Sequence, residues 1–250
     1  MKIRKLIKKP KYNLRLEEIR IYSAKESCIF KKNNEAFGEL SNMSTLFPIL
    51  VNDIRIKTVE ALYQSMRFPH MPQLQNQIIL EKSPMRVKMI SNKYKRESRK
   101  DWEIVRLQIM KWCLNVKYSQ NIFTFHPLLC KTGNSFIVEN SSSDNFWGAI
   151  PDENGEVYKG KNALGRLLME LREKAYSKYW MDLLYVSPPN IEHGLLLDRP
   201  IGIVDERSNF LSIFAEYWKR KGIPLDNTSQ SNSPSFDFLN KDLIDLFNID

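Results

Sequence analysis

A loop at residues 140–148, with the sequence Asn-Ser-Ser-Ser-Asp-Asn-Phe-Trp-Gly, places a carboxylate, several hydroxyls and two aromatic rings in one turn. Asp144 could act as a general base or bind a ribose hydroxyl, and Trp147 with Phe146 could stack on a nucleobase. The alternative is structural: Asp144 would form an Asx-turn and Trp147 would pack in the core. The spacing of these residues does not separate the two interpretations.

A second candidate is Lys88, which we expect about one turn into a helix that begins at Pro84. Lys82, Arg86 and Lys93 lie close to it in sequence. Neighbouring positive charges favour the neutral amine, which is the form that attacks a carbonyl and forms a Schiff base. The alternative is one more solvated lysine in a basic stretch, and the sequence alone favours that alternative.

A third candidate is a polar stripe on a helix that is otherwise apolar. Glu60, Gln64 and Arg67 are spaced i, i+4 and i+7, so they share one helix face. Such a face is either solvated or one wall of a site. The spacing by itself favours the solvated face.

Several sequence signals predict the helices that position these residues. Thr58 is a predicted N-cap of a helix that continues to about Phe68. Ser83-Pro84 places an N-cap serine before a proline at the first helical position. Residues 98–101 resemble a capping box that opens the strongest predicted helix. The apolar residues of that helix recur at spacings of three and four: Trp102, Val105, Ile109, Trp112 and Val116.

The remaining predicted elements are shorter. Strands are predicted near residues 19–22, at residues 51–56 around Asn52-Asp53, and at residues 136–139. Helices are predicted at residues 162–174 and 210–221. Together these predict an α+β fold: one helix-rich domain with a few short strands and an irregular C-terminal extension.

Composition excludes several classes of protein. With 250 residues, 42% of them hydrophobic, the chain is neither disordered nor fibrous. No segment approaches the roughly 20 apolar residues that span a bilayer, and the basic N-terminus lacks the apolar region of a secretory signal. Three scattered cysteines and three distant histidines predict neither disulfides nor a metal site. We therefore expect a reduced, cytoplasmic protein without a metal or cofactor.

The net charge of +9 is unevenly distributed. Residues 191–250 carry six basic and ten acidic side chains, whereas the first 190 carry 32 and 19. Lys and Arg residues are densest at residues 2–15 and 82–111. A basic surface attracts polyanions, so the charge leaves two interpretations open: contact with nucleic acid, or a solvated face of a basic protein.

Taken together, the motifs resemble the NADAR (YbiA-like) family of N-glycosidases over about residues 36–173. The matching stretches, in chain order, are residues 38–42 (Gly-Glu-Leu-Ser-Asn), 58–64 (Thr-Val-Glu-Ala-Leu-Tyr-Gln), 99–102 (Arg-Lys-Asp-Trp), 120–121 (Gln-Asn), 144–148 (Asp-Asn-Phe-Trp-Gly), 160–165 (Gly-Lys-Asn-Ala-Leu-Gly) and 168–173 (Leu-Met-Glu-Leu-Arg-Glu). Their order and approximate spacing both fit the family.

Four further stretches resemble the branch of antitoxins that counteract DarT-type ADP-ribosyltransferase toxins: residues 60–70, 82–89, 188–190 and 199–202. Housekeeping members typically have a lysine where this chain has Arg67. The resemblance implies removal of ADP-ribose from guanine bases of DNA, with a DarT-type toxin as partner. Two alternatives remain: a small-molecule N-glycosidase acting on riboflavin-biosynthesis intermediates, and a non-enzymatic module that binds ADP-ribose or a toxin.

The resemblance also implies roles for individual residues. A lysine would form a Schiff base with the opened ribose, and Lys88 is the best candidate because the guanidinium of Arg67 is a poor nucleophile. Glu60 would transfer a proton and Asp144 would assist. Substrate would be bound by Glu39, Ser41, Asn42, Gln64, Arg67, Asn121, Trp147, Asn162 and Arg172.

The predicted organisation has five parts. Residues 1–35 form a basic arm, 36–175 the NADAR-like catalytic domain and 176–221 a C-terminal extension of that domain. A flexible linker at 222–235 leads to a short amphipathic helix at 236–250.

Overall fold

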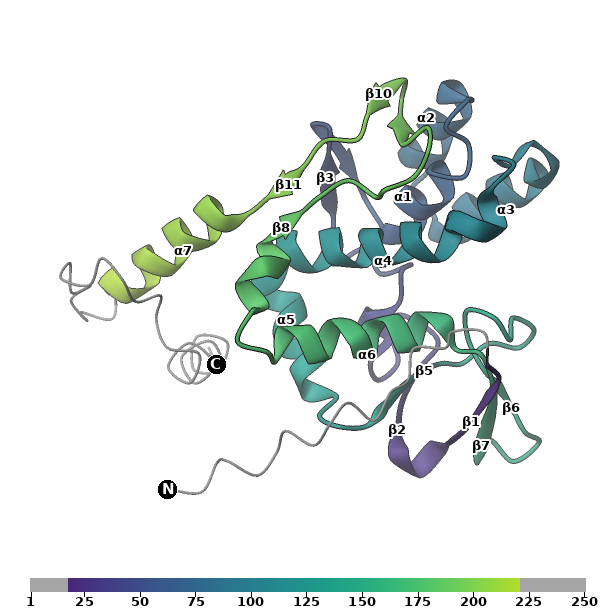
Figure 1. Cartoon of the computed structure of the whole chain (residues 1–250). Coiled ribbons are helices and arrows are strands. Elements are labelled where there is room, and N and C mark those ends of the chain that lie inside the picture. The colour runs from purple at the N-terminus through teal and green to yellow at the C-terminus, as the bar shows by residue number, and fades with distance from the viewer. Residues whose placement is uncertain (1–17, 221–250) are drawn as a thin grey trace. The chain divides into compact units, whose positions relative to one another are not determined.

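The computed structural model describes residues 18–220, so the predicted linker and terminal helix lie outside the described residues, as does most of the basic arm. One compact unit takes residues 18–44 and Leu128–Ser177. The other takes Thr45–Pro127 and residues 178–220. Helices and short strands occur in both units (Figure 1), which confirms the α+β fold class.

Two small sheets and one long helix make up the first unit. Strands β1 (Arg20–Ser23), β7 (Val157–Gly160) and β6 (Ile150–Pro151) form an antiparallel sheet, in that order. After a turn of 3-10 helix, η1 (Ala24–Glu26), strand β2 (Ser27–Phe30) pairs in parallel with β5 (Phe136–Glu139). A second such turn, η2 (Gly38–Leu40), belongs to the same unit. The core of the β1 sheet includes Tyr22, Val138, Ala149 and Tyr158.

Helix α6 (Ala163–Ala175) lies along β5, as Figure 1 shows. Four leucines on its apolar face are buried: Leu164, Leu167, Leu168 and Leu171. Gly165 lets the helix approach the strand, because a Cβ there would lie 2.0 Å from the carbonyl oxygen of Ile137.

A hairpin opens the second unit, in place of the single strand predicted at residues 51–56. Strands β3 (Ile49–Val51) and β4 (Ile54–Ile56) pair antiparallel. The prediction was wrong because Asn52 and Asp53 form the turn, with φ of 51° and 63°. Asn and Asp tolerate this left-handed conformation, and two successive residues with positive φ are typical of tight hairpin turns.

Four helices follow the hairpin. In α1 (Val59–Ser65), Thr58 Oγ1 accepts from the Ala61 amide at 3.2 Å, which confirms the N-cap, but the helix ends before Phe68. Helix α2 (Pro72–Leu80) was not predicted. Helix α3 (Pro84–Lys93) begins at the predicted Ser83 cap. A 3-10 turn, η3 (Lys95–Glu97), precedes α4 (Trp102–Gln120).

Helix α4 buries its whole predicted apolar stripe. The predicted capping box at residues 98–101 is wrong, because Asp101 is the N-cap residue and its side chain makes no capping bond. The Asp101 carboxylate instead pairs with Arg99 at 2.6 Å. Helix α5 (Ile122–Lys131), also not predicted, follows after one residue.

The C-terminal extension contains η4 (Trp180–Leu184), four two-residue strands and α7 (Arg207–Arg220). Strand β8 (Tyr185–Val186) pairs with β11 (Val204–Asp205), and β9 (Leu195–Leu196) pairs with β10 (Arg199–Pro200). Gln75 of α2 forms hydrogen bonds with β9 and with the residue that follows it. Its Nε2 donates to the Leu195 carbonyl at 3.0 Å, and its Oε1 accepts from the Leu197 amide at 2.7 Å. Among residues 18–220, no helix has the length and apolarity needed to cross a membrane.

Candidate active site

The polar face of α1 is buried, so the solvated-face interpretation is wrong. Glu60 is 6% exposed and Gln64 is 7% exposed. The helix packs against α2, α3 and α4, and all seven of its residues are buried. A carboxylate in such surroundings needs hydrogen-bond donors, because burial of an unsatisfied charge is costly.

Glu60 belongs to a chain of hydrogen bonds that joins two helices. Gln64 Nε2 donates to Glu60 Oε1 at 2.9 Å, and Ser91 Oγ donates to Gln64 Oε1. Ser91 is fully buried on α3. The sequence reasoning missed it, although its spacing of i+4 from the apolar Val87 is typical of a residue on a buried helix face. The chain fixes the amide of Gln64 between a carboxylate and a hydroxyl.

Lys88 lies on the same helix as Ser91, three residues before it, and its side chain is exposed. Residues at this spacing are neighbours on a helix surface. The helix that receives the hydrogen-bond chain from Glu60 therefore also carries the predicted nucleophile. The role of Lys88 stays a prediction.

The charge of Glu60 also affects the pKa of two nearby side chains, Tyr63 on α1 and Cys113 on α4. Burial raises the pKa of Tyr63 and of Cys113 well above their ordinary values. In both cases the Glu60 carboxylate raises the pKa further, since it disfavours a second negative charge nearby. Tyr63 and Cys113 therefore stay neutral, and Glu60 is the acidic group of this cluster.

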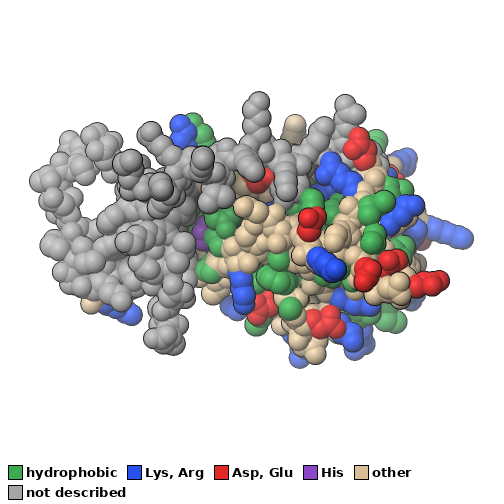
Figure 2. Space-filling model, turned by 90° about the horizontal axis from the view of Figure 1, so that it is seen from below, with side chains coloured by type: hydrophobic (Ala, Val, Ile, Leu, Met, Phe, Trp, Pro, Cys, Tyr) green, Lys and Arg blue, Asp and Glu red, His purple; other side chains and the backbone are tan. Residues whose placement is uncertain are grey.

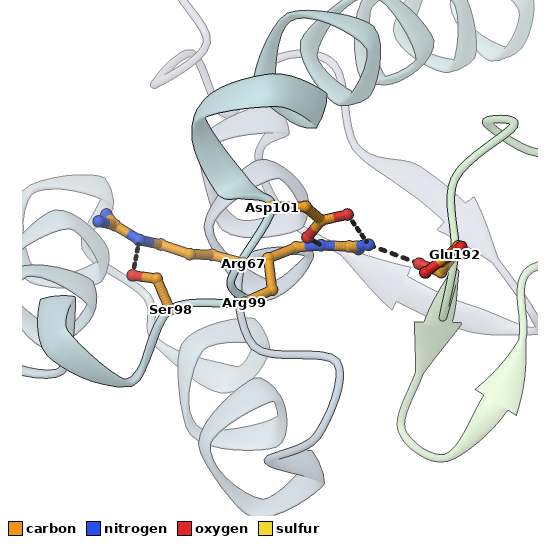
Figure 3. A network of polar contacts seen from close by, with 5 residues as sticks. All are labelled: Arg67, Ser98, Arg99, Asp101 and Glu192. Carbon is orange, nitrogen blue, oxygen red and sulfur yellow. Dashed lines mark hydrogen bonds and ion pairs between the residues drawn. The ribbon is translucent and has the colours of Figure 1, made fainter.

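Arg67 follows α1 and is 8% exposed. Its Nε donates to Ser98 Oγ at 2.6 Å, and its guanidinium carbon lies 5.2 Å from the centre of the Trp102 ring. Burial lowers the pKa of this guanidinium from its ordinary value. Figure 3 shows the Arg67 side chain extended toward Ser98 and directed away from Arg99.

In the first unit, Asp144 forms the Asx-turn of the structural alternative. Its Oδ1 accepts from the backbone amides of Phe146 at 3.0 Å and Trp147 at 2.9 Å. Trp147 is half-buried and packs edge-to-face against Phe146, with ring centres 5.0 Å apart, so its ring is not in the core. The start of α6 binds the loop, since the Leu164 amide donates to the Trp147 carbonyl at 3.0 Å. This loop is therefore held in one conformation while part of the Trp147 ring stays accessible.

Two predicted substrate ligands of the first unit are engaged in bonds that hold the fold. Asn162 is fully buried; its Nδ2 donates to the Ile137 carbonyl at 2.8 Å and its Oδ1 accepts from the Glu139 amide at 3.1 Å. Arg172, also buried, donates to Thr132 Oγ1 at 2.7 Å. These bonds join α6 to β5 and to the end of α5, and a role in substrate binding stays a prediction for both residues.

The other predicted ligands are distributed between the units. Glu39 is exposed, whereas Ser41 and Asn42 are buried, in the first unit. Asn121 ends α4 in the second unit, where its Nδ2 donates to the Pro48 carbonyl at 3.1 Å. Within the described part of the chain, no group of three His, Cys, Asp or Glu residues could hold a metal ion.

Comparison with known proteins matches the NADAR domain to residues 29–175. The chain is 32% identical to "N-glycosidase YbiA" of Escherichia coli (strain K12) over 145 residues, 58% of this chain and 86% of that protein. It is 29% identical to "Riboflavin biosynthesis protein VVA0006" of Vibrio vulnificus (strain YJ016), over 63% of this chain and 41% of that protein. The NMR structure of the Escherichia coli protein YbiA is similar with a TM-score of 0.51 and 31% identity, covering 59% of this chain and 83% of that one.

Proposed function

Since this chain belongs to the NADAR family, we propose that it is an N-glycosidase that releases ADP-ribose from guanine bases of DNA. The name of the YbiA relative, an N-glycosidase, supports the type of reaction. The observation that carries the proposal is a buried carboxylate, Glu60, hydrogen-bonded through Gln64 and Ser91 to the helix that displays Lys88. This arrangement supplies an acid–base group and an amine from two adjoining helices.

The proposed reaction exchanges one C–N bond for another. The Glu60 carboxylate takes a proton from the Lys88 ammonium and passes it to the ribose ring oxygen as the ring opens, and the resulting neutral Lys88 amine attacks C1. The bond from C1 to the guanine nitrogen breaks, and guanine leaves with a proton. Water then adds to the lysine imine, which releases ADP-ribose and restores the free amine.

Asp144 and Trp147, both in the first unit, are the other residues to which the resemblance gives a role in catalysis or in stacking. Asp144 Oδ1 is used by the turn, and no hydrogen bond from a residue within 18–220 reaches its Oδ2. That oxygen could accept a proton or bind a hydroxyl. The half-buried Trp147 ring could stack on the base, since a nucleobase offers a flat apolar face.

Exposed basic side chains on and beside α3 support DNA as the carrier of the substrate. Between residues 82 and 100 the exposed basic side chains are Lys82, Arg86, Lys88, Lys93, Lys95, Arg96 and Lys100, against one exposed acid, Glu97. On the face shown in Figure 2, by contrast, Lys and Arg are interspersed with Asp and Glu. Phosphates are attracted to a positively charged surface, so the Lys88 amine lies where DNA would bind.

The proposed partner is a DarT-type toxin that attaches the ADP-ribose. Support comes from the resemblance at residues 60–70, 82–89, 188–190 and 199–202. The last two stretches lie in the extension, beyond the matched domain. The glycosidase would then act as the antitoxin.

A small-molecule N-glycosidase of riboflavin synthesis is the second candidate. The name of the Vibrio vulnificus relative, a riboflavin biosynthesis protein, favours this second activity. The same Glu60 and Lys88 chemistry would apply to a phosphoribosyl-amine substrate. This activity requires no DNA, so it would show no salt-dependent affinity for oligonucleotides.

The test uses the purified chain and an oligonucleotide carrying ADP-ribosylated guanine, with released ADP-ribose measured by mass spectrometry. Glu60→Gln and Lys88→Ala should each lower the rate at least ~100-fold, because each removes a group used in the chemical step. Lys25→Ala is the control, since it removes the same charge from an exposed position in η1, outside the basic surface. It should change the rate less than ~3-fold at fixed salt.

Borohydride reduction during turnover should attach the sugar covalently to Lys88. Trapping that proceeds equally well in Lys88→Ala would show that another lysine forms the imine. Release of base from a phosphoribosyl-amine pyrimidine, with none from the oligonucleotide, would establish the second candidate. Toxin neutralisation that survives loss of both Glu60 and Lys88 would instead indicate a non-enzymatic binding module.

A further inference from the structure

Two neighbouring arginines have opposite surroundings (Figure 3). Arg99 makes a two-pronged ion pair: its Nε lies 2.6 Å from Asp101 Oδ1 and its Nη2 lies 2.9 Å from Asp101 Oδ2. It also donates to the Glu192 carbonyl. Arg67 has a neutral partner instead, Ser98. Arg99 thus has a carboxylate partner, although its Nη1 is buried without a hydrogen bond, whereas Arg67 has no carboxylate in direct contact.

No carboxylate among residues 18–220 pairs with Arg67. Glu103 is the acidic side chain whose charge acts on it, and Glu103 is itself paired with Arg106 at 2.9 Å. The group Arg67, Glu103 and Arg106 therefore carries one net positive charge. Burial of a charge without a counter-ion is unfavourable, so the fold alone gives no reason for arginine at this position.

The Arg67 guanidinium is nevertheless held in a defined orientation. Ser98 Oγ donates its proton to the Lys95 carbonyl at 2.5 Å, which leaves its lone pairs for the Nε–H of Arg67. The Trp102 ring lies 5.2 Å from the guanidinium carbon. The two terminal nitrogens have no hydrogen-bond or ion-pair partner within the described residues. The guanidinium of Arg67 is therefore held at Nε, and its terminal nitrogens, which are not among the buried atoms that lack a hydrogen bond, are left for solvent or a ligand.

We propose that the two terminal nitrogens of Arg67 bind a phosphate group of the substrate, with Ser98 and Trp102 as the residues that position the guanidinium. This inference rests on the proposed function and deepens it: it assigns a phosphate contact within the second unit. A guanidinium and a phosphate form two parallel charge-assisted hydrogen bonds, which a lysine ammonium does not reproduce. Binding of the anion compensates the buried charge.

The experiment measures binding without turnover, by calorimetry, with three probes: inorganic pyrophosphate, ribose 5-phosphate and ADP-ribose. The variants are Arg67→Gln, Arg67→Lys and the control Arg55→Gln, which removes an exposed positive charge from β4 of the same unit. Arg67→Gln should weaken binding of at least one probe ~10- to 100-fold, and Arg67→Lys should weaken it by less. Arg55→Gln should change it less than ~3-fold.

The probes separate the possible sources of phosphate. Weakening confined to ribose 5-phosphate assigns Arg67 to a monophosphate, and weakening of pyrophosphate and ADP-ribose assigns it to a diphosphate. Melting of the free protein tells binding from structure: Arg67→Gln should melt no lower than the wild type, because it removes an uncompensated charge.

Three results would overturn the inference: wild-type protein that binds none of the probes, equal affinity in Arg67→Gln, or a large fall in melting temperature with unchanged affinity. If Arg67→Gln does not fold, Arg67→Lys takes its place, because it keeps the positive charge. Wild-type affinity of Arg67→Lys for all three probes would refute paired hydrogen bonding by the guanidinium. Glycosidase activity with normal phosphate binding in Arg67→Gln would leave the proposed function standing. Phosphate binding that depends on Arg67, in a protein without glycosidase activity, would support this inference and refute the proposed function.

Discussion

Asp144 has a structural duty and a proposed chemical one, and two substitutions separate them. The carboxylate holds its turn through Oδ1, which accepts two backbone amides at 2.9 and 3.0 Å. An asparagine side chain at this position would keep an oxygen acceptor and lose the negative charge, so Asp144→Asn tests the charge. Alanine would remove the acceptor, so Asp144→Ala tests the turn.

The magnitudes follow from these two bonds. Hydrogen bonds to a charged group are worth about 1.5–3 kcal/mol when buried, but this loop is half-exposed and water can replace part of the loss. We expect Asp144→Ala to cost ~1–2 kcal/mol, comparable with loss of a helix N-cap. At ~2–4 °C per kcal/mol, its melting temperature should fall by several degrees. Asp144→Asn should cost less than ~1 kcal/mol.

The activities of the two Asp144 variants should not follow their stabilities. If the free oxygen transfers a proton, Asp144→Asn should lower kcat/KM ~100-fold while its melting temperature stays within about 4 °C of the wild type. Asp152 offers a matched control in the first unit, because its Oδ1 likewise accepts two backbone amides, from Glu156 and Val157. Asp152→Asn and Asp152→Ala should repeat the stability effects without loss of rate.

The assays are thermal melting by circular dichroism and release of ADP-ribose from the modified oligonucleotide. Wild-type activity in Asp144→Asn, with the expected loss of stability in Asp144→Ala, would refute the chemical role and leave a turn residue. An equal fall in activity in Asp152→Asn would show that the measured rate reports general damage to the unit.

Two further predictions concern stability. His126 is buried against the Tyr118 hydroxyl, 2.8 Å from its Nδ1, and burial lowers its pKa to about 4. Because the unfolded chain takes up this proton near pH 6.5, stability should fall as pH drops from 6.5 to 4, by up to about 3 kcal/mol; urea melts should show this slope, and its persistence in His126→Gln would contradict the assignment. Gln75 is fully buried and bonds Ser65, Leu195 and Leu197. Gln75→Ala should lower the free energy of unfolding by ~2–4 kcal/mol, with faster amide exchange at β9, and slow exchange there would argue against the attachment.

Local signals accounted for the elements whose ends and faces are determined by neighbouring residues. Thr58 and Ser83 begin their helices because a side-chain oxygen can satisfy an amide three residues on. The stripe from Trp102 to Val116 is buried because its spacing matches the helix period. The capping box failed because the carboxylate of Asp101 found a stronger partner in Arg99, a competition that spacing does not reveal.

The sequence by itself determined the α+β class, the main helices and the family, since these depend on periodicity, caps and the order of motifs. Tertiary structure decided which polar residues are buried. The α1 face looked solvated by spacing, yet Glu60 and Gln64 are enclosed because α2, α3 and α4 pack around a short helix. It also decided that Arg99 has a carboxylate and Arg67 does not, because packing, unlike spacing, sets which charges meet in a medium where an unpaired charge is costly.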